Sequence, residues 1–216
     1  MTLAKFEDIS IHECGEPLVD LGDYSFILEP SYFNQGLSTE SRMFLRQSVA
    51  EKLMEIQKGL SEYTFKIWDG FRPRSVQKVI YEKFLQELHI AHPDWDEEKL
   101  KTEVGVFVTT PNNPKRVPPH ATGGAIDLTL VDAQGKELDM GTAFDHFGPE
   151  AEPFYFEKSA QNHQVQENRK VLRGAMLEAD FAIDKDEWWH FDYGNQRWAL
   201  ALGRTNAIFG EVEIQK

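Results

Sequence analysis

The strongest strand pattern in the chain is Ala125-Ile126-Asp127-Leu128-Thr129-Leu130-Val131. Its aliphatic and β-branched residues favour an extended backbone. Apolar residues flank Asp127 on both sides, so we expect its carboxylate near the core, where an unpaired charge is costly. A metal ion or a strong hydrogen-bond donor would offset that cost. The stretch therefore predicts an interior strand whose one acidic group has a partner elsewhere in the chain.

The rest of the chain predicts helices and strands without a regular alternation. Helices are predicted at residues 39–60, 75–90 and 163–180, with a short one starting at Asp94 and a capping residue at Glu97. Strands are predicted at residues 18–21, 24–28, 64–68 and 187–193, and another begins at Ala207. A turn at residues 132–135 should pair the central strand with residues 136–140, and residues 141–161 should form a long loop. This mixture indicates an α+β fold, with a small mixed or antiparallel sheet flanked by helices in a single domain of residues 1–216.

Composition excludes several classes of protein. The 216 residues carry a net charge of −13, which repels polyanions and makes nucleic acid an unsuitable partner. No window approaches the roughly 18 apolar residues of a membrane-spanning helix, so we expect no membrane partner. The single Cys14 excludes an internal disulfide and a multi-thiolate zinc cluster. The first residues do not resemble a signal peptide, which favours a cytoplasmic location; the oligomeric state stays open.

His120, Asp127 and His190 are candidate metal ligands. Two imidazoles and one carboxylate, with a fourth position left for water, suit catalytic zinc. The proline-rich residues 110–119 predict a loop that delivers His120, and Gly123-Gly124 can fold the chain back towards Asp127. Taken alone, His120 is better explained as a loop histidine without a role. The expected burial of Asp127 favours the metal site.

Glu187 and Arg72 are candidate catalytic residues. Glu187 precedes His190 by three residues, so it could accept a proton from the attacking water and pass it to the leaving amine. Arg72 follows a predicted strand and could stabilise an oxyanion or bind a substrate carboxylate. The alternatives are a glutamate at a sheet edge and a surface arginine paired with one of the many acidic residues.

Three motifs in this chain together resemble the D-alanyl-D-alanine dipeptidase family of zinc peptidases, which is related to D,D-carboxypeptidases and to the hedgehog domain. In sequence order they are Trp68-Asp69-Gly70-Phe71-Arg72-Pro73, His120-Ala121-Thr122-Gly123-Gly124-Ala125-Ile126-Asp127 and Glu187-Trp188-Trp189-His190. Each motif alone is weak, but their order is that of the family, and together they cover about residues 60–193.

The resemblance implies a hedgehog/D,D-peptidase-like fold and one Zn²⁺ per chain. It implies the metal ligands His120, Asp127 and His190, the general base Glu187, the transition-state-stabilising Arg72 and the ammonium-binding Asp145. The chain departs from the family at Pro118, where the family usually has a serine. This departure leaves the metal ligands intact and leaves the exact dipeptide preference open.

Three functions follow, in decreasing order of support. The first is zinc-dependent hydrolysis of a small D,D-dipeptide such as D-Ala-D-Ala, which makes a dipeptide the expected partner. The second is a peptidoglycan D,D-carboxypeptidase or endopeptidase, which would accept N-acylated substrates. The third is a non-catalytic zinc-containing binding module, against which Glu187 and Arg72 argue because a structural zinc site needs neither.

Overall fold

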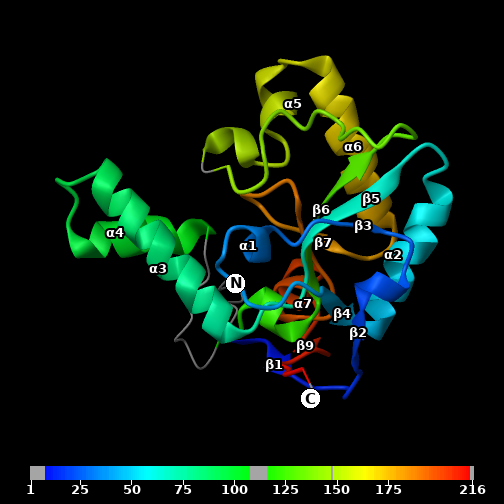
Figure 1. Ribbon diagram of the computed structural model, residues 1–216, viewed down its shortest axis with the longest axis horizontal. Coiled ribbons are helices and arrows are strands. Elements are labelled where there is room, and N and C mark those ends of the chain that lie inside the picture. Colours follow the sequence, from blue (N-terminus) through cyan, green and yellow to red (C-terminus); the bar gives the residue numbers. More distant parts are fainter. Residues whose placement is uncertain (1–7, 108–115, 147, 215–216) are drawn as a thin grey trace.

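A five-stranded mixed sheet is centred on β6 (Ala125–Val131), with the strand order β3-β5-β6-β8-β7 (Figure 1). The computed structural model describes residues 8–107, 116–146 and 148–214. At one edge β3 (Ile27–Leu28) runs parallel to β5 (Thr64–Asp69). The pairings β5-β6, β6-β8 (His190–Asp192) and β8-β7 (Ala182–Ile183) are antiparallel. All residues of β6 are buried, as its sequence predicts.

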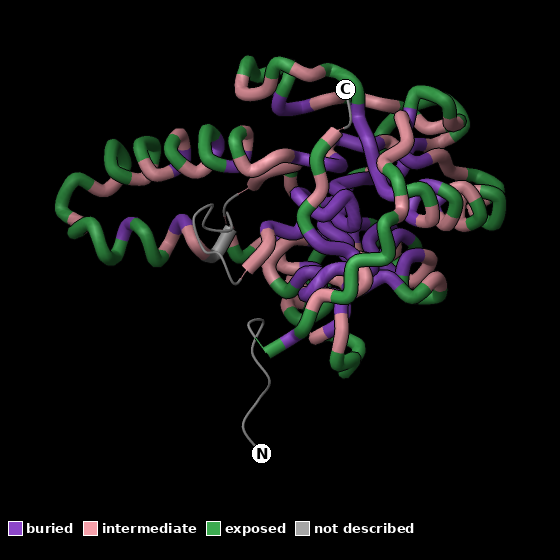
Figure 2. Tube along the Cα trace, turned by 90° about the horizontal axis from the view of Figure 1, so that it is seen from below, coloured by how far each residue is buried: buried purple, intermediate pink, exposed green. Residues whose placement is uncertain are grey.

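Two short sheets and several helices surround this sheet. The short sheets pair β2 (Leu18–Asp20) with β4 (Phe44–Arg46) and β1 (Ser10–Ile11) with β9 (Asn206–Ala207). The helices are α1 (Ser31–Asn34), α2 (Gln47–Gly59), α3 (Arg74–Ala91), α4 (Glu97–Phe107), α5 (Tyr155–Ser159), α6 (His163–Glu178) and α7 (Gln196–Ala201). Helices α3 and α4 form an arm that projects from the body, and the buried parts of the chain gather in the body itself (Figures 1 and 2). In the described part of the chain, no helix has the length and apolarity needed to cross a membrane.

The two faces of the central sheet have different roles. Side chains alternate along a strand, so Ile126, Leu128 and Leu130 share one face of β6. They belong to the main core, together with Leu53 of α2 and Met176 of α6. The opposite face carries the acidic group at position 127. Helices α2 and α6 therefore cover one face and leave the other for the polar residues.

Strand register brings three polar residues into one row on that second face. Asp127 of β6 is opposite Asp69 on β5 and opposite His190 on β8. Directly paired residues of neighbouring strands point to the same side of a sheet. The register alone thus places these three side chains next to one another. A register irregularity between Ile67 and Asp69 of β5 immediately precedes this row.

The predicted helix at residues 39–60 is wrong at its start. Residues 44–46 form β4, and α2 begins only at Gln47. The backbone of this segment pairs with β2, and Phe44 O also accepts a hydrogen bond from Phe71 N. Leu45, whose spacing fits the apolar stripe of a helix, is fully buried in a strand instead. Pairing with a distant segment therefore overrides the local periodicity.

Other boundaries also differ from the predictions. The strand expected at residues 187–193 is limited to His190–Asp192, because Glu187 lies before a turn at residues 188 and 189. Helix α4 begins at Glu97, and its first turn is capped by Asp96 Oδ1, which accepts from Lys99 N, rather than by Asp94. The expected loop at residues 141–161 contains the 3-10 turn η4 (Pro149–Ala151) and α5. The hairpin after β6 is reduced to a turn and one isolated bridge between Val131 and Glu137.

The predicted fold class is confirmed: helices flank a small mixed sheet. Strands β2, β3 and β9, the predicted strand at residues 64–68, and helices α3 and α6 lie where the sequence places them, with shifted ends. Residues 110–115 of the predicted proline-rich loop lie outside the described residues, and Pro119 begins the 3-10 turn η3 (Pro119–Thr122). The extent of the single domain stays a prediction.

Gly124 permits the close approach of β6 and β8. A Cβ atom there would overlap the carbonyl oxygen of Tyr193 and lie 2.9 Å from Cδ2 of Phe209. We expect Gly124→Ala to lower the free energy of unfolding by about 2–3 kcal/mol, because overpacking forces the strands apart. Urea unfolding measures this loss.

The control is Gly174→Ala, in the interior of α6, where a Cβ atom meets nothing within 4 Å. That change should raise stability by up to about 1 kcal/mol, because alanine favours the helix over glycine. Equal urea midpoints for the two variants would contradict the proposed strand contact.

Candidate active site

Three buried side chains from separate elements meet on the polar face of the sheet. His120 comes from the 3-10 turn η3, which ends at Gly123 in the left-handed conformation with φ 69°. Asp127 lies in β6, seven residues after His120, and His190 begins β8. Their exposed fractions are 3%, 3% and 4%, respectively. The structure therefore brings all three predicted metal ligands together in the interior.

The inward-facing atoms of these residues lie within one coordination sphere. His120 Nε2 is 3.2 Å from His190 Nδ1 and 3.4 Å from Asp127 Oδ2. His190 Nδ1 is 3.0 Å from Asp127 Oδ1. One ligand atom from each residue can be chosen so that all lie within 4.8 Å of one another. Two nitrogens and one carboxylate oxygen are a donor set that Zn²⁺ binds in catalytic sites.

The outer nitrogens of both imidazoles lie next to oxygen atoms of other residues: that of His120 is hydrogen-bonded, and that of His190 is in an ion-pair contact without hydrogen-bond geometry. His120 Nδ1 is 2.7 Å from the carbonyl oxygen of Gly70, to which it can donate a hydrogen bond. His190 Nε2 is 3.2 Å from Asp192 Oδ1. A neutral imidazole that donates through its outer nitrogen presents a lone pair at the inner one. In that tautomer, each inner nitrogen would present its lone pair to a cation bound between the two rings and Asp127.

The carboxylates and imidazoles in and around the ligand set stabilise each other's charged forms. Burial alone would raise the pKa of Asp127, but His120 and His190 outweigh it and the pKa is lowered. Burial alone would lower the pKa of His190, but Asp192 and Asp127 outweigh it and the pKa is raised well above its usual value. Carboxylates thus surround the imidazoles, which adds negative potential where a cation would bind.

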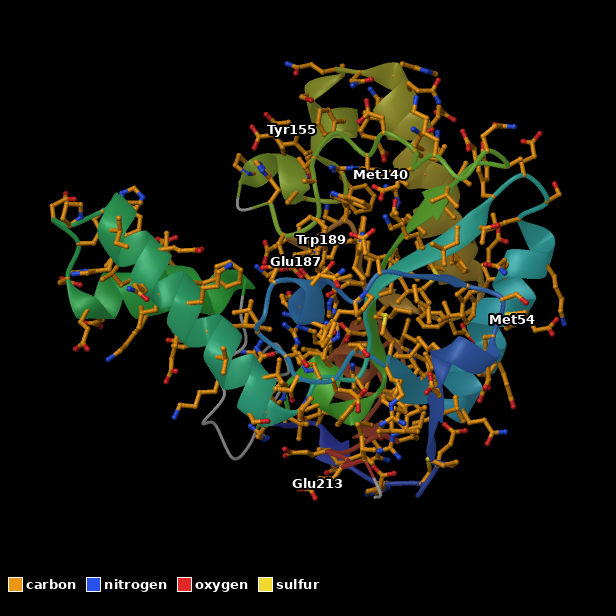
Figure 3. The ribbon with its side chains drawn as sticks, viewed as in Figure 1. Met54, Met140, Tyr155, Glu187, Trp189 and Glu213 are labelled. Carbon is orange, nitrogen blue, oxygen red and sulfur yellow. The ribbon has the colours of Figure 1, made fainter. Side chains whose placement is uncertain are left out.

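Glu187 lies beside the three ligands, on the chain segment just before the turn at residues 188 and 189; its position and that of Trp189 are labelled in Figure 3. Glu187 Oε2 is 3.9 Å from His190 Nδ1, the inward-facing nitrogen. Burial, followed by the charge of Asp184, raises the pKa of Glu187 well above its usual value. A carboxylate with a raised pKa next to a metal site can accept a proton.

Arg72 is buried, with an exposed fraction of 8%, so the surface-arginine alternative is wrong. Its Nε is 3.1 Å from Asp69 Oδ2, and its guanidinium lies 4.8 Å from the centre of the Tyr32 ring. Its backbone N–H donates to the carbonyl oxygen of His120. These contacts fix a permanent positive charge next to the ligand set.

Asp145 lies on the long loop after β6 and has a left-handed backbone with φ 58°. The hydroxyl of Tyr32 donates to Asp145 Oδ1 across 3.2 Å. Burial, followed by the charge of Asp127, raises the pKa of Asp145 to about 7. The neighbouring Phe144 stacks on Trp68 at 4.9 Å between ring centres and thereby ties the loop to β5. Asp145 is therefore a partly buried carboxyl group whose charge interacts with that of Asp127 in the ligand set.

Sequence reasoning missed Asp69, Tyr32 and Asp192 as members of the site. Asp69 is 3.3 Å from His120 Nδ1 as well as paired with Arg72. The signal for Asp69 was present, because it belongs to the same motif as Arg72. Asp192 follows His190 by two residues, a spacing that puts both on one face of a strand. Tyr32 lies in α1, and no local pattern connects it to Asp145.

Comparison with known proteins identifies the family. The profile of the family described as D-Ala-D-Ala dipeptidase matches residues 31–208. The chain belongs to the D-Ala-D-Ala dipeptidase family. This is a family of zinc peptidases, in agreement with the donor set described above. The family resemblance carried by the three sequence motifs is thus confirmed.

Two D-alanyl-D-alanine dipeptidases are similar to this chain in sequence. A D-alanyl-D-alanine dipeptidase of Synechocystis sp. is 28% identical over 95% of this chain and 95% of its own length. That of Escherichia coli is 31% identical over 62% of this chain and 56% of its own length. Among solved structures, a vancomycin-resistance D,D-pentapeptidase VanY variant in complex with Zn(II) covers 93% of this chain and 96% of that one, at 12% identity and a TM-score of 0.49.

Asp192 orients His190, so we expect Asp192→Asn to weaken zinc binding by about 10–100-fold, as is typical for residues that hold a ligand histidine. Competition with a chromophoric chelator measures the affinity. Asp94→Asn, at an exposed position on the arm, serves as the control and should leave the affinity unchanged. Equal affinities for the two variants would show that Asp192 does not tune the metal site.

Proposed function

We propose that this chain is a zinc-dependent dipeptidase that hydrolyses a small free D,D-dipeptide such as D-Ala-D-Ala. One observation carries the proposal: three ligand side chains, a proton-accepting carboxyl group and a fixed guanidinium converge at one buried point of a chain that belongs to this family. The names of its relatives give the substrate class.

His120, Asp127 and His190 would hold the metal. Bound Zn²⁺ supplies a Lewis acid that lowers the pKa of water and polarises the peptide carbonyl. Gly70 and Asp192 keep the two imidazoles in the orientation that this binding needs. The close spacing of the inward-facing atoms supports this ligand set.

Glu187 would act as the general base. Its carboxylate accepts a proton from the attacking water and then delivers that proton to the amine that leaves. The 3.9 Å distance from its Oε2 to His190 Nδ1 places the carboxylate beside the ligand set, and its raised pKa means that it has a higher affinity for a proton than an exposed glutamate.

Arg72 would stabilise the negative charge that develops on the peptide oxygen. Its ion pair with Asp69 and its contact with the Tyr32 ring hold the guanidinium in place before substrate arrives. A charge that is already fixed requires no reorganisation of the site during the reaction. This preorganisation is the source of its catalytic effect.

Asp145 would bind the ammonium group of the free dipeptide, with Tyr32 orienting the carboxylate. A carboxylate that is partly withdrawn from solvent gains from a cationic partner, because the loss of its water contacts is otherwise unfavourable. This favours a free dipeptide over the N-acylated ends that a peptidoglycan carboxypeptidase or endopeptidase would take. The replacement of the family serine by Pro118 leaves the side-chain preference to experiment, and the cytoplasmic location stays a prediction.

Glu187→Ala should lower kcat by about 10²–10⁴-fold, because proton transfer by a positioned group contributes this much. The variant should keep about one zinc per chain, because the three ligands are unchanged. Hydrolysis of D-Ala-D-Ala and metal analysis of the purified protein measure both effects. Glu178→Ala, at an exposed position on α6, is the control. Full activity of Glu187→Ala would overturn the assignment of the base.

The ratio of kcat/KM for free D-Ala-D-Ala to that for its N-acetylated form should depend on pH. Asp145 binds an ammonium only when ionised, and its pKa is raised to about 7 in the metal-free site. Positive charge from zinc lowers that pKa, so the ratio should fall as the pH drops through a midpoint at or below about 7.

In Asp145→Asn the same ratio should be small and, below about pH 7, independent of pH, because the carboxyl group that titrates there has been removed. Ionisations that affect both substrates cancel in this ratio. A pH-dependent ratio that survives Asp145→Asn would assign ammonium recognition to another residue.

A further inference from the structure

The loop that carries Asp145 depends on contacts outside itself for its shape. We call residues 139–152 the Asp145 loop; residue 147 lies outside the described part of the chain. Among its described residues, the regular structure is the 3-10 turn Pro149–Ala151. A segment with so few internal hydrogen bonds must be positioned by neighbouring elements.

Arg169 of α6 binds both ends of this loop. Its Nε donates to the carbonyl oxygen of Met140 across 2.7 Å. Its Nη1 and Nη2 donate to the carbonyl oxygens of Glu152 and Glu150 across 2.8 and 2.9 Å. The side chain is buried, with an exposed fraction of 3%. One guanidinium thus joins the beginning of the loop to its end.

The same guanidinium contacts the segment that carries the proposed base. It lies 5.5 Å from the centre of the Trp188 ring, and Trp188 directly follows Glu187. Trp188 is itself bonded to the loop twice: its backbone N–H donates to Ala151 O, and its Nε1 donates to Thr142 Oγ1 across 2.8 Å. Arg169 and Trp188 therefore connect the Asp145 loop and the Glu187 segment into one unit.

We propose that Arg169 is a positioning residue for substrate recognition, which fixes the Asp145 loop relative to Glu187. The proposal rests on the proposed function, because it assumes that Asp145 binds the ammonium and that Glu187 is the base. A dipeptide must reach both groups at once, so their separation selects a substrate with a free amino group close to the scissile bond. If the Asp145 loop were held less firmly, the preference for a free amino group would be lost first. Zinc binding and the base Glu187 would be retained.

The chain contains a matched control in Arg173, one helical turn further along α6. Arg173 is also buried, with an exposed fraction of 9%, and also stacks on an aromatic ring, that of Phe154. Its guanidinium binds Glu157 and the carbonyl oxygen of Pro153, both outside the Asp145 loop. Loss of Arg173 should therefore cost stability without displacing Asp145.

The experiment compares Arg169→Lys with Arg173→Lys in the full-length zinc-loaded protein. Lysine keeps the positive charge but cannot donate to three carbonyl oxygens in the geometry of a guanidinium. For Arg169→Lys we expect KM for D-Ala-D-Ala to rise about 10-fold or more, because small displacements of a binding group have effects of this size. We expect kcat to change less, and the preference for free over N-acetylated dipeptide to fall by a similar factor.

Arg173→Lys should leave KM and this preference unchanged, and all variants should retain one zinc per chain. The proposal would be overturned if KM of Arg169→Lys rose no more than KM of Arg173→Lys. It would also be overturned if Arg169→Lys lost kcat equally on the free and the N-acetylated dipeptide. Thr142→Val removes the hydrogen bond from Trp188 to the Asp145 loop and should also raise KM. This variant tests whether contacts outside the loop position Asp145 if Arg169→Lys does not fold.

The two proposals fail in different ways. If the wild-type protein shows no zinc-dependent hydrolysis of either substrate, the proposed function is wrong and the role of Arg169 falls with it. If the wild type hydrolyses the free dipeptide and Arg169→Lys keeps both its KM and its preference, only the role of Arg169 is wrong.

Discussion

The site depends on the antiparallel pairing of β6 with its two neighbours. That pairing sets Asp127 between Asp69 and His190, so three polar residues share one row on the face that α2 and α6 do not cover. A slip by one residue would turn Asp127 into the apolar core and break the ligand set. The buried Ile126, Leu128 and Leu130 oppose such a slip, because it would move them to the polar face. Packing of the core thus enforces the geometry of the chemistry.

Around this row the protein places each charge next to a fixed partner. Gly70 and Asp192 hold the two histidines, Asp69 holds Arg72, and Tyr32 holds Asp145. Groups restrained in this way reach their working orientation during folding and not during the reaction, which reduces the reorganisation that catalysis requires. The aromatic contacts of Phe144 and Trp188 extend the same restraint to the segments that carry Asp145 and Glu187.

The sequence allowed the metal ligands and the fold class to be predicted, because His120, Asp127 and His190 belong to motifs with unusual residue content. It was less informative where distant segments decide the local structure. Residues 44–46 have helical periodicity, yet they pair with β2, and nothing near them in the sequence indicates this. The contact of Tyr32 with Asp145 spans 113 positions, and the clamp by Arg169 acts on carbonyl groups that every residue has. Side chains that bind backbone atoms leave no pattern for sequence reasoning to detect.

The arm of α3 and α4 lies in the chain between β5 and β6, and this has a consequence for the order of folding. The arm can form early, because its helices are neighbours in sequence and contact each other. The central sheet requires chain closures over long distances, since His120 and His190 are 70 positions apart. The ligand set therefore forms only when β8 pairs with β6, and a nascent chain that ends before β8 has no complete zinc site.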